Sequence, residues 1–160
     1  MPEMPSSNRA SWSHTHLGHW LRLALERFDA RVMELMAHHP GVPLGLANLA
    51  ARGQVGAAHI HITRHLSPEG LRLTDLAQRA GMSKQAMGAL VNQCEAWGMV
   101  TREADPTDAR ARRVLFTATG LAWLGAYQDA AAQTEAEMQS AVGTEVATVV
   151  AIGLEAYCGQ

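Results

Sequence analysis

Apolar residues recur at three- and four-residue intervals along most of this 160-residue chain, which is the spacing of one face of an α-helix. The pattern predicts a long amphipathic helix from Ser13 to His39, ended by Pro40 and Gly41. Its apolar stripe consists of Leu17, Leu21, Ala24, Leu25, Phe28, Val32 and Leu35. A second helical stretch over residues 44–66 is expected to break at a glycine near position 53 or 56.

Residues 73–98 predict two short helices joined by a tight turn. Thr74 can cap the first helix, and Gly81 supplies the turn because glycine tolerates a positive φ. Ser83 can cap the second helix, whose apolar face is Met87, Leu90, Val91 and Cys94. Its opposite face carries small or hydrogen-bonding residues, namely Lys84, Gln85, Gly88, Ala89 and Asn92. Such a face can enter a DNA major groove, where Gln85 or Asn92 can pair bidentately with adenine.

A β-hairpin is predicted next, with strands over 99–102 and 112–117 and a turn region over 103–109. Arg110 lies near the tip, where a guanidinium can enter a narrow minor groove. Asp108 can hold Arg110 through charge-assisted hydrogen bonds. Arg112 and Arg113 point to opposite faces of the strand, so at most one of them is expected to face DNA. Two short helices followed by this hairpin predict a winged helix-turn-helix that binds double-stranded DNA.

Helices are predicted again over 119–140 and 144–157. The first is expected to bury Leu121, Leu124, Tyr127, Ala131 and Met138. The second is apolar nearly all round, with Val146, Val149, Val150, Ile152 and Leu154. Because a small winged domain cannot cover such a helix, we expect the terminal helices to pack against a second copy of the chain.

The net charge of −2 argues against a nucleic-acid binder, but its distribution reverses that conclusion. Residues 1–62 carry +1, residues 63–113 carry +2, and residues 114–160 carry −5. Positive charge therefore lies where phosphate would be met, and the acidic C-terminal segment is expected to face away from it. The N-terminus has no secretory signal pattern, no apolar run is long enough for a membrane span, and the cytoplasm is the expected compartment.

The run from Leu73 to Gly120 resembles the multiple-antibiotic-resistance regulator (MarR) family. The matching motifs are Leu76-Ala77, Gly81-Met82-Ser83, Leu90-Val91, Trp97 to Arg102, Asp105 to Arg110 and Phe116 to Gly120. The Asp-x-Arg pattern of the wing, followed by a strand and Thr-x-x-Gly, is the most telling of them. The flanking helices fall where that family has its dimerisation helices, so the likeness covers about residues 15–157.

The resemblance implies a homodimer whose paired second helices enter successive major grooves of a pseudo-palindromic operator, with wing arginines in the flanking minor grooves. It also implies repression relieved by a small ligand, commonly an aromatic or lipophilic acid, bound between the dimer helices and the DNA-binding lobe. Trp20, Arg31, His59 and His61 are candidates to line that pocket. Gly88 and Ala89 depart from the family, because many members place a hydroxyl or an arginine there for base contact.

We therefore expect a mainly α-helical fold with a small β-hairpin wing. The expected organisation is a flexible tail over 1–13, an N-terminal dimerisation helix over 14–43, a winged helix-turn-helix lobe over 44–118 and C-terminal dimerisation helices over 119–160. The residues expected to serve DNA binding are Thr74, Ser83, Lys84, Gln85, Gly88, Asn92, Asp108, Arg110 and Arg112.

Two other functions fit parts of the sequence. All eight histidines lie in the first 65 residues, and His61 and His65, like His16 and His19, are one turn apart and can share a zinc ion. The cysteines or clustered carboxylates that usually complete a zinc site are missing, so we expect no metal. The other alternative is a degenerate winged domain that only contacts proteins, which the small residues of the second helix allow.

No catalytic motif is present: there is no Gly-x-Ser-x-Gly elbow, no phosphate-binding glycine loop and no His-Glu-x-x-His. We therefore expect neither enzymatic activity nor a cofactor. Cys94 and Cys158 stand in helical patterns rather than a spaced disulfide framework, which suits a reducing compartment. Cys94 is expected to be a core thiol rather than a redox switch, because no basic neighbour is evident in the sequence.

Overall fold

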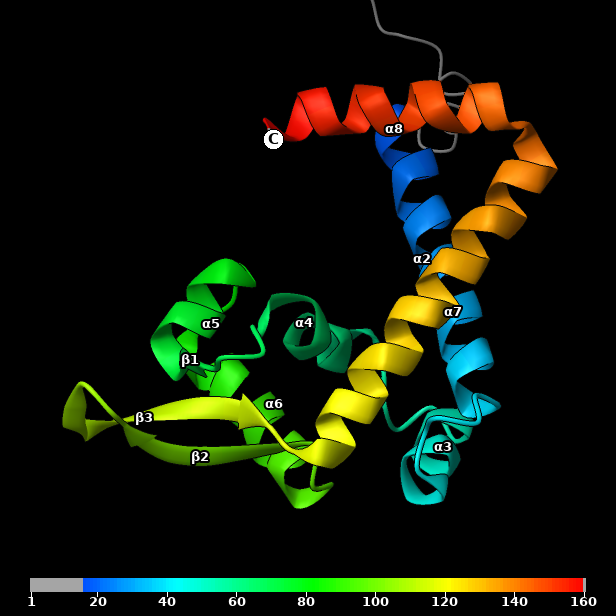
Figure 1. Ribbon diagram of the computed structural model, residues 1–160. Helices are drawn as coiled ribbons and strands as arrows, with labels where there is room; N and C mark the ends of the chain where they lie inside the picture. Colours follow the sequence, from blue (N-terminus) through cyan, green and yellow to red (C-terminus); the bar gives the residue numbers. More distant parts are fainter. Residues whose placement is uncertain (1–15, 160) are drawn as a thin grey trace, which may run out of the picture.

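The computed structural model describes residues 16–159, which form a mainly helical fold with a small antiparallel sheet, as predicted. In chain order the elements are α2 (Leu17–Ala37), α3 (Leu44–Ala51), α4 (Ala57–His65), β1 (Leu71–Arg72), α5 (Leu73–Arg79), α6 (Lys84–Ala96), β2 (Val100–Asp105), β3 (Asp108–Phe116), α7 (Ala118–Val142) and α8 (Thr144–Cys158). The tail predicted over 1–13 lies outside the described residues. Figure 1 shows a lobe of α4, α5, α6 and the sheet beside a scaffold in which α2 and α7 run alongside each other below α8.

His16 is the N-cap of α2, and its ring Nδ1 accepts a hydrogen bond from the His19 backbone N–H at 3.2 Å. The stripe predicted for this helix is buried only in its C-terminal half. Val32 and Met36 are fully buried, since that half packs against α3 and α7, whereas Leu17 is 73% exposed. Leu21, Leu23 and Leu25 are exposed too. The N-terminal half of α2 therefore presents an apolar surface that the described part of the chain does not cover.

The helical stretch predicted over residues 44–66 is broken between α3 and α4, as expected. Gly53 follows α3 with a φ of 67°, a conformation that side chains rarely adopt, and Gly56 is the N-cap of α4. The glycines let the chain leave one helix and start the next within a few residues.

Helix α4 ties the lobe to the scaffold. The buried Trp123 of α7 donates its indole N–H to Thr63 Oγ1 at 3.1 Å. Arg64 donates to Asp29 Oδ1 of α2 at 2.7 Å and to the Tyr127 hydroxyl of α7 at 2.8 Å. A single turn of α4 is thus bonded to both long scaffold helices.

The three-stranded sheet has the order β1-β3-β2, and both pairs are antiparallel. The hairpin is longer than predicted: β2 continues to Asp105, and β3 begins at Asp108, so only Pro106 and Thr107 form the turn. The physical reason is that Asp105 Oδ1 accepts hydrogen bonds from the Thr107 N–H at 2.8 Å and hydroxyl at 2.6 Å. These bonds close a two-residue turn. The strand β1 was not predicted, because two residues carry no periodicity.

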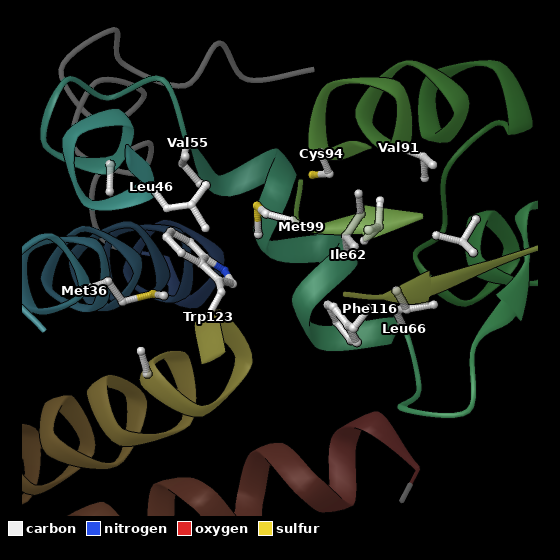
Figure 2. Packing of buried hydrophobic residues seen from close by; sticks show 14 of the residues in the cluster. Met36, Leu46, Val55, Ile62, Leu66, Val91, Cys94, Met99, Phe116 and Trp123 are labelled. Atoms are coloured by element: carbon white, nitrogen blue, oxygen red, sulfur yellow. The ribbon is translucent and has the colours of Figure 1, made fainter. Parts of the chain in front are cut away.

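One continuous core joins the lobe and the scaffold. Figure 2 shows its scaffold side around Trp123, with Met36, Leu46 and Val55, and its lobe side with Ile62, Leu66, Val91, Cys94, Met99 and Phe116. Phe116 is buried, as expected for its position in the strand. The lobe therefore rests on the scaffold through apolar packing as well as through the hydrogen bonds of α4.

The face that α7 buries differs from the predicted one. The buried residues are Gly120, Trp123, Ala126, Ala130 and Thr134, whereas Leu121 and Met138 are exposed and the other expected core residues are half-buried. The start of the helix fixes this rotation. Thr117 Oγ1 caps α7 by accepting from the Gly120 N–H at 3.0 Å, and a Cβ at Gly120 would lie only 1.9 Å from the Met99 carbonyl oxygen. The side of α7 at Gly120, which carries no side chain, must therefore face Met99.

Helix α8 follows a bend at Gly143 and packs on α7. Of its fifteen residues only Ala147 is buried. Among the described residues no single helix is long and apolar enough to cross a membrane; α7 and α8 pass that test only as a pair bent by 119°.

Candidate nucleic-acid interface

The turn between α5 and α6 forms as predicted. Gly81 has a φ of 63°, and the Met82 N–H donates to the Ala77 carbonyl at 2.9 Å. Ser83 Oγ caps α6 by accepting from the Ala86 N–H at 3.1 Å. The cap predicted at Thr74 is wrong: α5 already begins at Leu73, and its N-cap is Arg72, which makes no side-chain cap bond. Thr74 instead lies exposed in the first turn, since the helix follows β1 directly.

Helix α6 separates a buried face from an exposed one. Met87, Val91 and Cys94 are fully buried. Lys84, Gln85, Ala89 and Asn92 are exposed, as predicted. Gly88 does not belong to that exposed face. It is half-buried, and a Cβ there would lie 3.7 Å from Leu73 Cδ2, because α5 packs against α6 here.

Asn92 has a partner from the wing. Its Oδ1 accepts a hydrogen bond from Arg102 Nη2 of β2 at 2.6 Å. The same guanidinium is ion-paired with Glu95, the next carboxylate along α6. Neither contact was predicted, because the sequence does not show which strand residue lies beside which turn of a helix.

Arginines of the wing divide between the two faces of β3, as predicted. Arg110 and Arg112 are exposed. Arg112 pairs in register with Ala104 and shares a sheet face with the buried Val114, two residues on. Arg113 points the other way and donates to the Gly70 carbonyl at 2.9 Å. Arg113 therefore holds the loop before β1, and Arg110 and Arg112 remain exposed. Figure 1 shows the tip of this hairpin extending beyond the helices of the lobe.

The predicted bond between the side chains of Asp108 and Arg110 is replaced by another arrangement. Asp108 Oδ1 accepts from the backbone N–H of Arg110 at 3.1 Å, and its other oxygen lies 3.7 Å from Arg72 Nη2. The carboxylate reaches the backbone of a residue two positions on more easily than the end of its long side chain. Asp108 thus fixes the path of the chain at Arg110 and leaves the guanidinium outside.

An ion pair that the sequence did not reveal joins the turn end of β2 to β1. Arg72 Nε donates to Asp105 Oδ2 at 2.7 Å, across the two outer strands of the sheet. The hydroxyl and N–H of Thr107, together with the Arg72 guanidinium, hold the pKa of Asp105 well below its usual range. The only local signal was Asp105-Pro106-Thr107, which marks the turn but not the arginine that meets it.

His59 connects α4 to α6. Its Nδ1 accepts from the Gly56 N–H at 3.1 Å, so the proton is on Nε2, which lies 2.7 Å from Gln93 Oε1 of α6. The ring also packs on Trp97, with 4.7 Å between ring centroids. His59 is 7% exposed and bonds on both sides to protein atoms. These contacts indicate a structural role for His59 in joining α4 to α6.

A cavity of about 590 Å³ lies between α2 and α7. Its lining includes Ala24, Arg27, Phe28, Arg31, Thr134, Glu137, Met138 and Val142. Among the candidate pocket residues, Arg31 lines this cavity, Trp20 is 55% exposed near the start of α2, and His59 lies at α6. The side chain of His61 lies outside the described set. Of the three candidates whose side chains are described, only Arg31 therefore lines this cavity.

Arg31 is bound on both sides within the cavity wall. It donates to both carboxylate oxygens of Glu137 at 2.8 Å and to Glu34 at 2.8 Å. The bidentate bond from Arg31 lowers the pKa of Glu137 to about 2. Arg27 lines the same cavity without an ion pair to any described residue.

The described histidines and cysteines form neither a metal site nor a disulfide. In the range 16–159, no group of three or more His, Cys, Asp or Glu side chains is placed to hold a metal ion. Both cysteines are free thiols; Cys158 is exposed, and burial raises the pKa of Cys94 to about 12. Cys94 is therefore a core residue of α6, as its spacing predicted.

Residues 54–111, from the end of α3 to the middle of β3, match the model of the MarR family. A comparison with curated proteins found no match.

Solved structures share the fold over nearly the whole chain. The transcriptional repressor CouR bound to a 23-mer DNA duplex has a TM-score of 0.67 at 21% identity, covering 98% of this chain and 99% of that one. CouR from Rhodococcus jostii RHA1 bound to p-coumaroyl-CoA has a TM-score of 0.66 at 14% identity, covering 91% and 93%. BpsR from Bordetella bronchiseptica, whose DNA binding is regulated by 6-hydroxynicotinic acid, has a TM-score of 0.65 at 17% identity, covering 92% and 96%. The family model thus matches the winged lobe, and the solved structures share the fold of that lobe and of both flanking helical regions.

Proposed function

We propose that this protein is a homodimeric, ligand-responsive transcriptional repressor, which binds a pseudo-palindromic operator through α6 and the wing of a DNA-binding domain that spans residues 44–118. The observation that carries the proposal is the pairing, in one lobe, of an exposed small and polar face on α6 with exposed arginines at the end of the hairpin. DNA recognition by a winged helix needs both, because the helix contacts base edges and the wing contacts the flanking backbone or minor groove. The DNA complex of CouR, which has this fold, supports the assignment.

Charge pairing within the lobe also favours DNA binding. Arg64, Arg72 and Arg102 are neutralised by carboxylates of the protein. Lys84 at the start of α6 and Arg110 and Arg112 on the wing form no ion pair with the described residues, and all three are exposed. Arg52 and Arg79 are also exposed without an ion pair to the described residues, so the available positive charge includes the two elements expected to contact DNA but is not confined to them.

The wing assignment is tested with Arg110→Ala. The operator, expected to span roughly 16 to 20 base pairs, is first selected from fragments of the source genome. At physiological salt the variant is expected to lose most of its operator binding, and its salt slope should fall by about one. Arg22→Ala is the matched control, because Arg22 lies on α2 in an exposed pair with Glu26, outside the lobe. If Arg110→Ala binds operator as tightly as the parent, the wing assignment fails.

Dimerisation is proposed from the apolar surface that the scaffold leaves uncovered. Val149, Ile152 and Tyr157 of α8 are 69%, 59% and 86% exposed, and the N-terminal half of α2 also has exposed leucines. Large exposed apolar surface marks an interface, and a second copy of the same helices would cover it. We expect Ile152→Asp to sediment as a monomer and to lose operator binding. Leu44→Asp, at the 78% exposed Leu44 of α3, is the control that should stay dimeric; a dimeric Ile152→Asp would contradict this interface.

The effector is proposed to bind in the cavity between α2 and α7. The lining is mostly apolar, and Arg27 offers a cation to an acidic group, whereas Arg31 is already bound by two glutamates. An aromatic or lipophilic acid fits this combination, as the ligands of CouR and BpsR suggest. Met138 and Val142 belong both to this lining and to the exposed apolar surface, so a second copy would close the cavity and link ligand binding to dimer geometry.

The cavity assignment is tested by thermal unfolding with a panel of aromatic acids. A binding acid should raise the melting temperature of the parent and release it from operator. Arg27→Met is expected to abolish both effects, and Arg22→Met, which removes a cation from the same helix outside the lining, should keep them. An acid that still stabilises Arg27→Met as strongly as the parent would place the effector elsewhere.

A further inference from the structure

The exposed face of α6 contains one side chain whose orientation is already fixed by the protein. Gln85, Ala89 and Asn92 follow one another at positions i, i+4 and i+7, so they form one line along the helix. Asn92 differs from Gln85 in that its carbonyl oxygen already accepts a hydrogen bond from a side chain of the protein. Arg102 Nη2 donates to Asn92 Oδ1 at 2.6 Å.

Arg102 is held in place by its own surroundings. It pairs in register with the buried Val114, so both side chains lie on the sheet face that packs against α6. Its guanidinium is ion-paired with Glu95 as well as bonded to Asn92, and the side chain is only 26% exposed. Two bonds from one planar guanidinium to residues i and i+3 of the same helix fix the group along α6.

The chemistry of the two groups decides which way the amide points. A guanidinium has only donors, so it can meet the oxygen of the Asn92 amide but not its NH₂ group. In a planar amide the NH₂ group then points away from Arg102. Bidentate pairing with adenine requires the oxygen and the nitrogen of one amide to face the same base edge. Arg102 uses one of the two lone pairs of the oxygen and holds the amide with its NH₂ group outward, so the N–H donors are the groups that Asn92 presents.

We propose that Arg102 is a positioning residue that holds the Asn92 amide with its NH₂ group outward, so that Asn92 donates to an acceptor of the DNA and does not pair bidentately with adenine. The acceptor is a phosphate oxygen, N7 of a purine, O6 of guanine or O4 of thymine. This inference rests on the proposed function, and it replaces the adenine pairing that the residue type alone suggested for Asn92.

A double-mutant cycle on operator binding tests the proposal. Asn92→Leu removes the donor with little change in shape and is expected to weaken binding by about tenfold. Arg102→Met removes the guanidinium, frees the amide to rotate, and should weaken binding several-fold in the parent. In the Asn92→Leu background, Arg102→Met should cause no further loss, since it acts through Asn92. Equal losses in both backgrounds, or no loss in either, overturn the proposal.

Two further variants separate positioning from general effects of charge and folding. Arg113→Met removes a cation from the same hairpin, but Arg113 bonds to the Gly70 carbonyl rather than to α6. Its effect on binding should be the same with and without Asn92. Arg102→Lys keeps a charged donor for Asn92 Oδ1 and should restore most of the affinity lost in Arg102→Met. Thermal unfolding of each variant confirms that the lobe is folded.

Selection from a randomised operator library identifies the acceptor. If Asn92 contacts a base, Asn92→Leu loses the preference for a purine, for guanine or for thymine at one position; if it contacts a phosphate, the variant binds all sequences more weakly by the same factor. A preference for adenine over guanine in the parent that disappears in Asn92→Leu overturns the proposal. A parent protein that selects no DNA motif refutes the proposed function and this inference with it, whereas a parent that selects an operator while the cycle shows independent losses refutes this inference alone.

Discussion

Replacing Gly120 with alanine should destabilise the fold, although alanine is the better residue for a helix interior. Gly120 lies in the first turn of α7, where the helix meets Met99 just before β2. A Cβ at this position would be 1.9 Å from the Met99 carbonyl oxygen and 2.9 Å from Phe116 Cδ1. Ordinary carbon–oxygen contacts are about 3.3 Å or longer, so the start of α7 would have to move by on the order of 1 Å.

The magnitude follows from three contributions. Gly→Ala in an unobstructed helix interior stabilises by about 0.5–1 kcal/mol. Overpacking of a close contact costs about 1–3 kcal/mol. Moving the first turn also disturbs the Thr117 cap, whose Oγ1 accepts from the Gly120 N–H at 3.0 Å and lies 3.2 Å from the Met99 oxygen; losing an N-cap costs about 1 kcal/mol. The net expectation is a destabilisation of about 2–3 kcal/mol.

Urea unfolding followed by far-ultraviolet circular dichroism measures this change. Parent and variant are compared at equal protein concentration, because a dimer makes the free energy of unfolding depend on concentration. Gly125→Ala is the matched control: Gly125 lies in the same helix, and nothing is within 4 Å of a Cβ there. It should stabilise by about 0.5–1 kcal/mol. If Gly120→Ala is as stable as the parent or more so, the close approach of α7 to Met99 is not what requires glycine.

Three further predictions concern the wing, the cysteines and the tie between lobe and scaffold. Because the pKa of Asp105 is lowered in the folded state, its ionisation stabilises the protein above the unfolded pKa of about 3.9 and the stabilisation is lost as the pH falls below it. Urea unfolding between pH 5 and pH 3 should therefore show a steeper loss for the parent than for Asp105→Asn, and parallel curves would contradict the ion pair. Iodoacetamide at pH 8, followed by mass spectrometry, should modify Cys158 and spare Cys94, whose pKa is raised to about 12 by burial; equal labelling would show that α6 opens readily. Trp123→Phe removes the donor to Thr63 and part of a fully buried ring, so it should destabilise the protein by about 2 kcal/mol in the same urea assay. A change below about 0.5 kcal/mol would argue against a structural role for the bond between Trp123 and Thr63.

Local signals in the sequence determined much of the lobe. Gly81 and Ser83 form the turn and cap that their residue types predicted. The apolar spacing of α6 correctly predicted the burial of Met87, Val91 and Cys94. Such signals act between residues a few positions apart, where the backbone itself sets the distance. The existence of the wing and the opposite directions of Arg112 and Arg113 follow from the same short-range rules.

The contacts that set the candidate site depend instead on how separate elements meet. The register of β1 on β3 decides that Arg72 meets Asp105, and the packing of the sheet on α6 decides that Arg102 takes the oxygen of Asn92. The buried face of α7 likewise follows from its docking on Met99, against the face that its apolar residues suggested. An apolar side chain can be covered by this chain or by a second copy, so periodicity alone does not determine which face of a helix is buried within the chain. Only tertiary structure fixes it, because partners far apart in sequence come within bonding distance through the register and packing of whole elements.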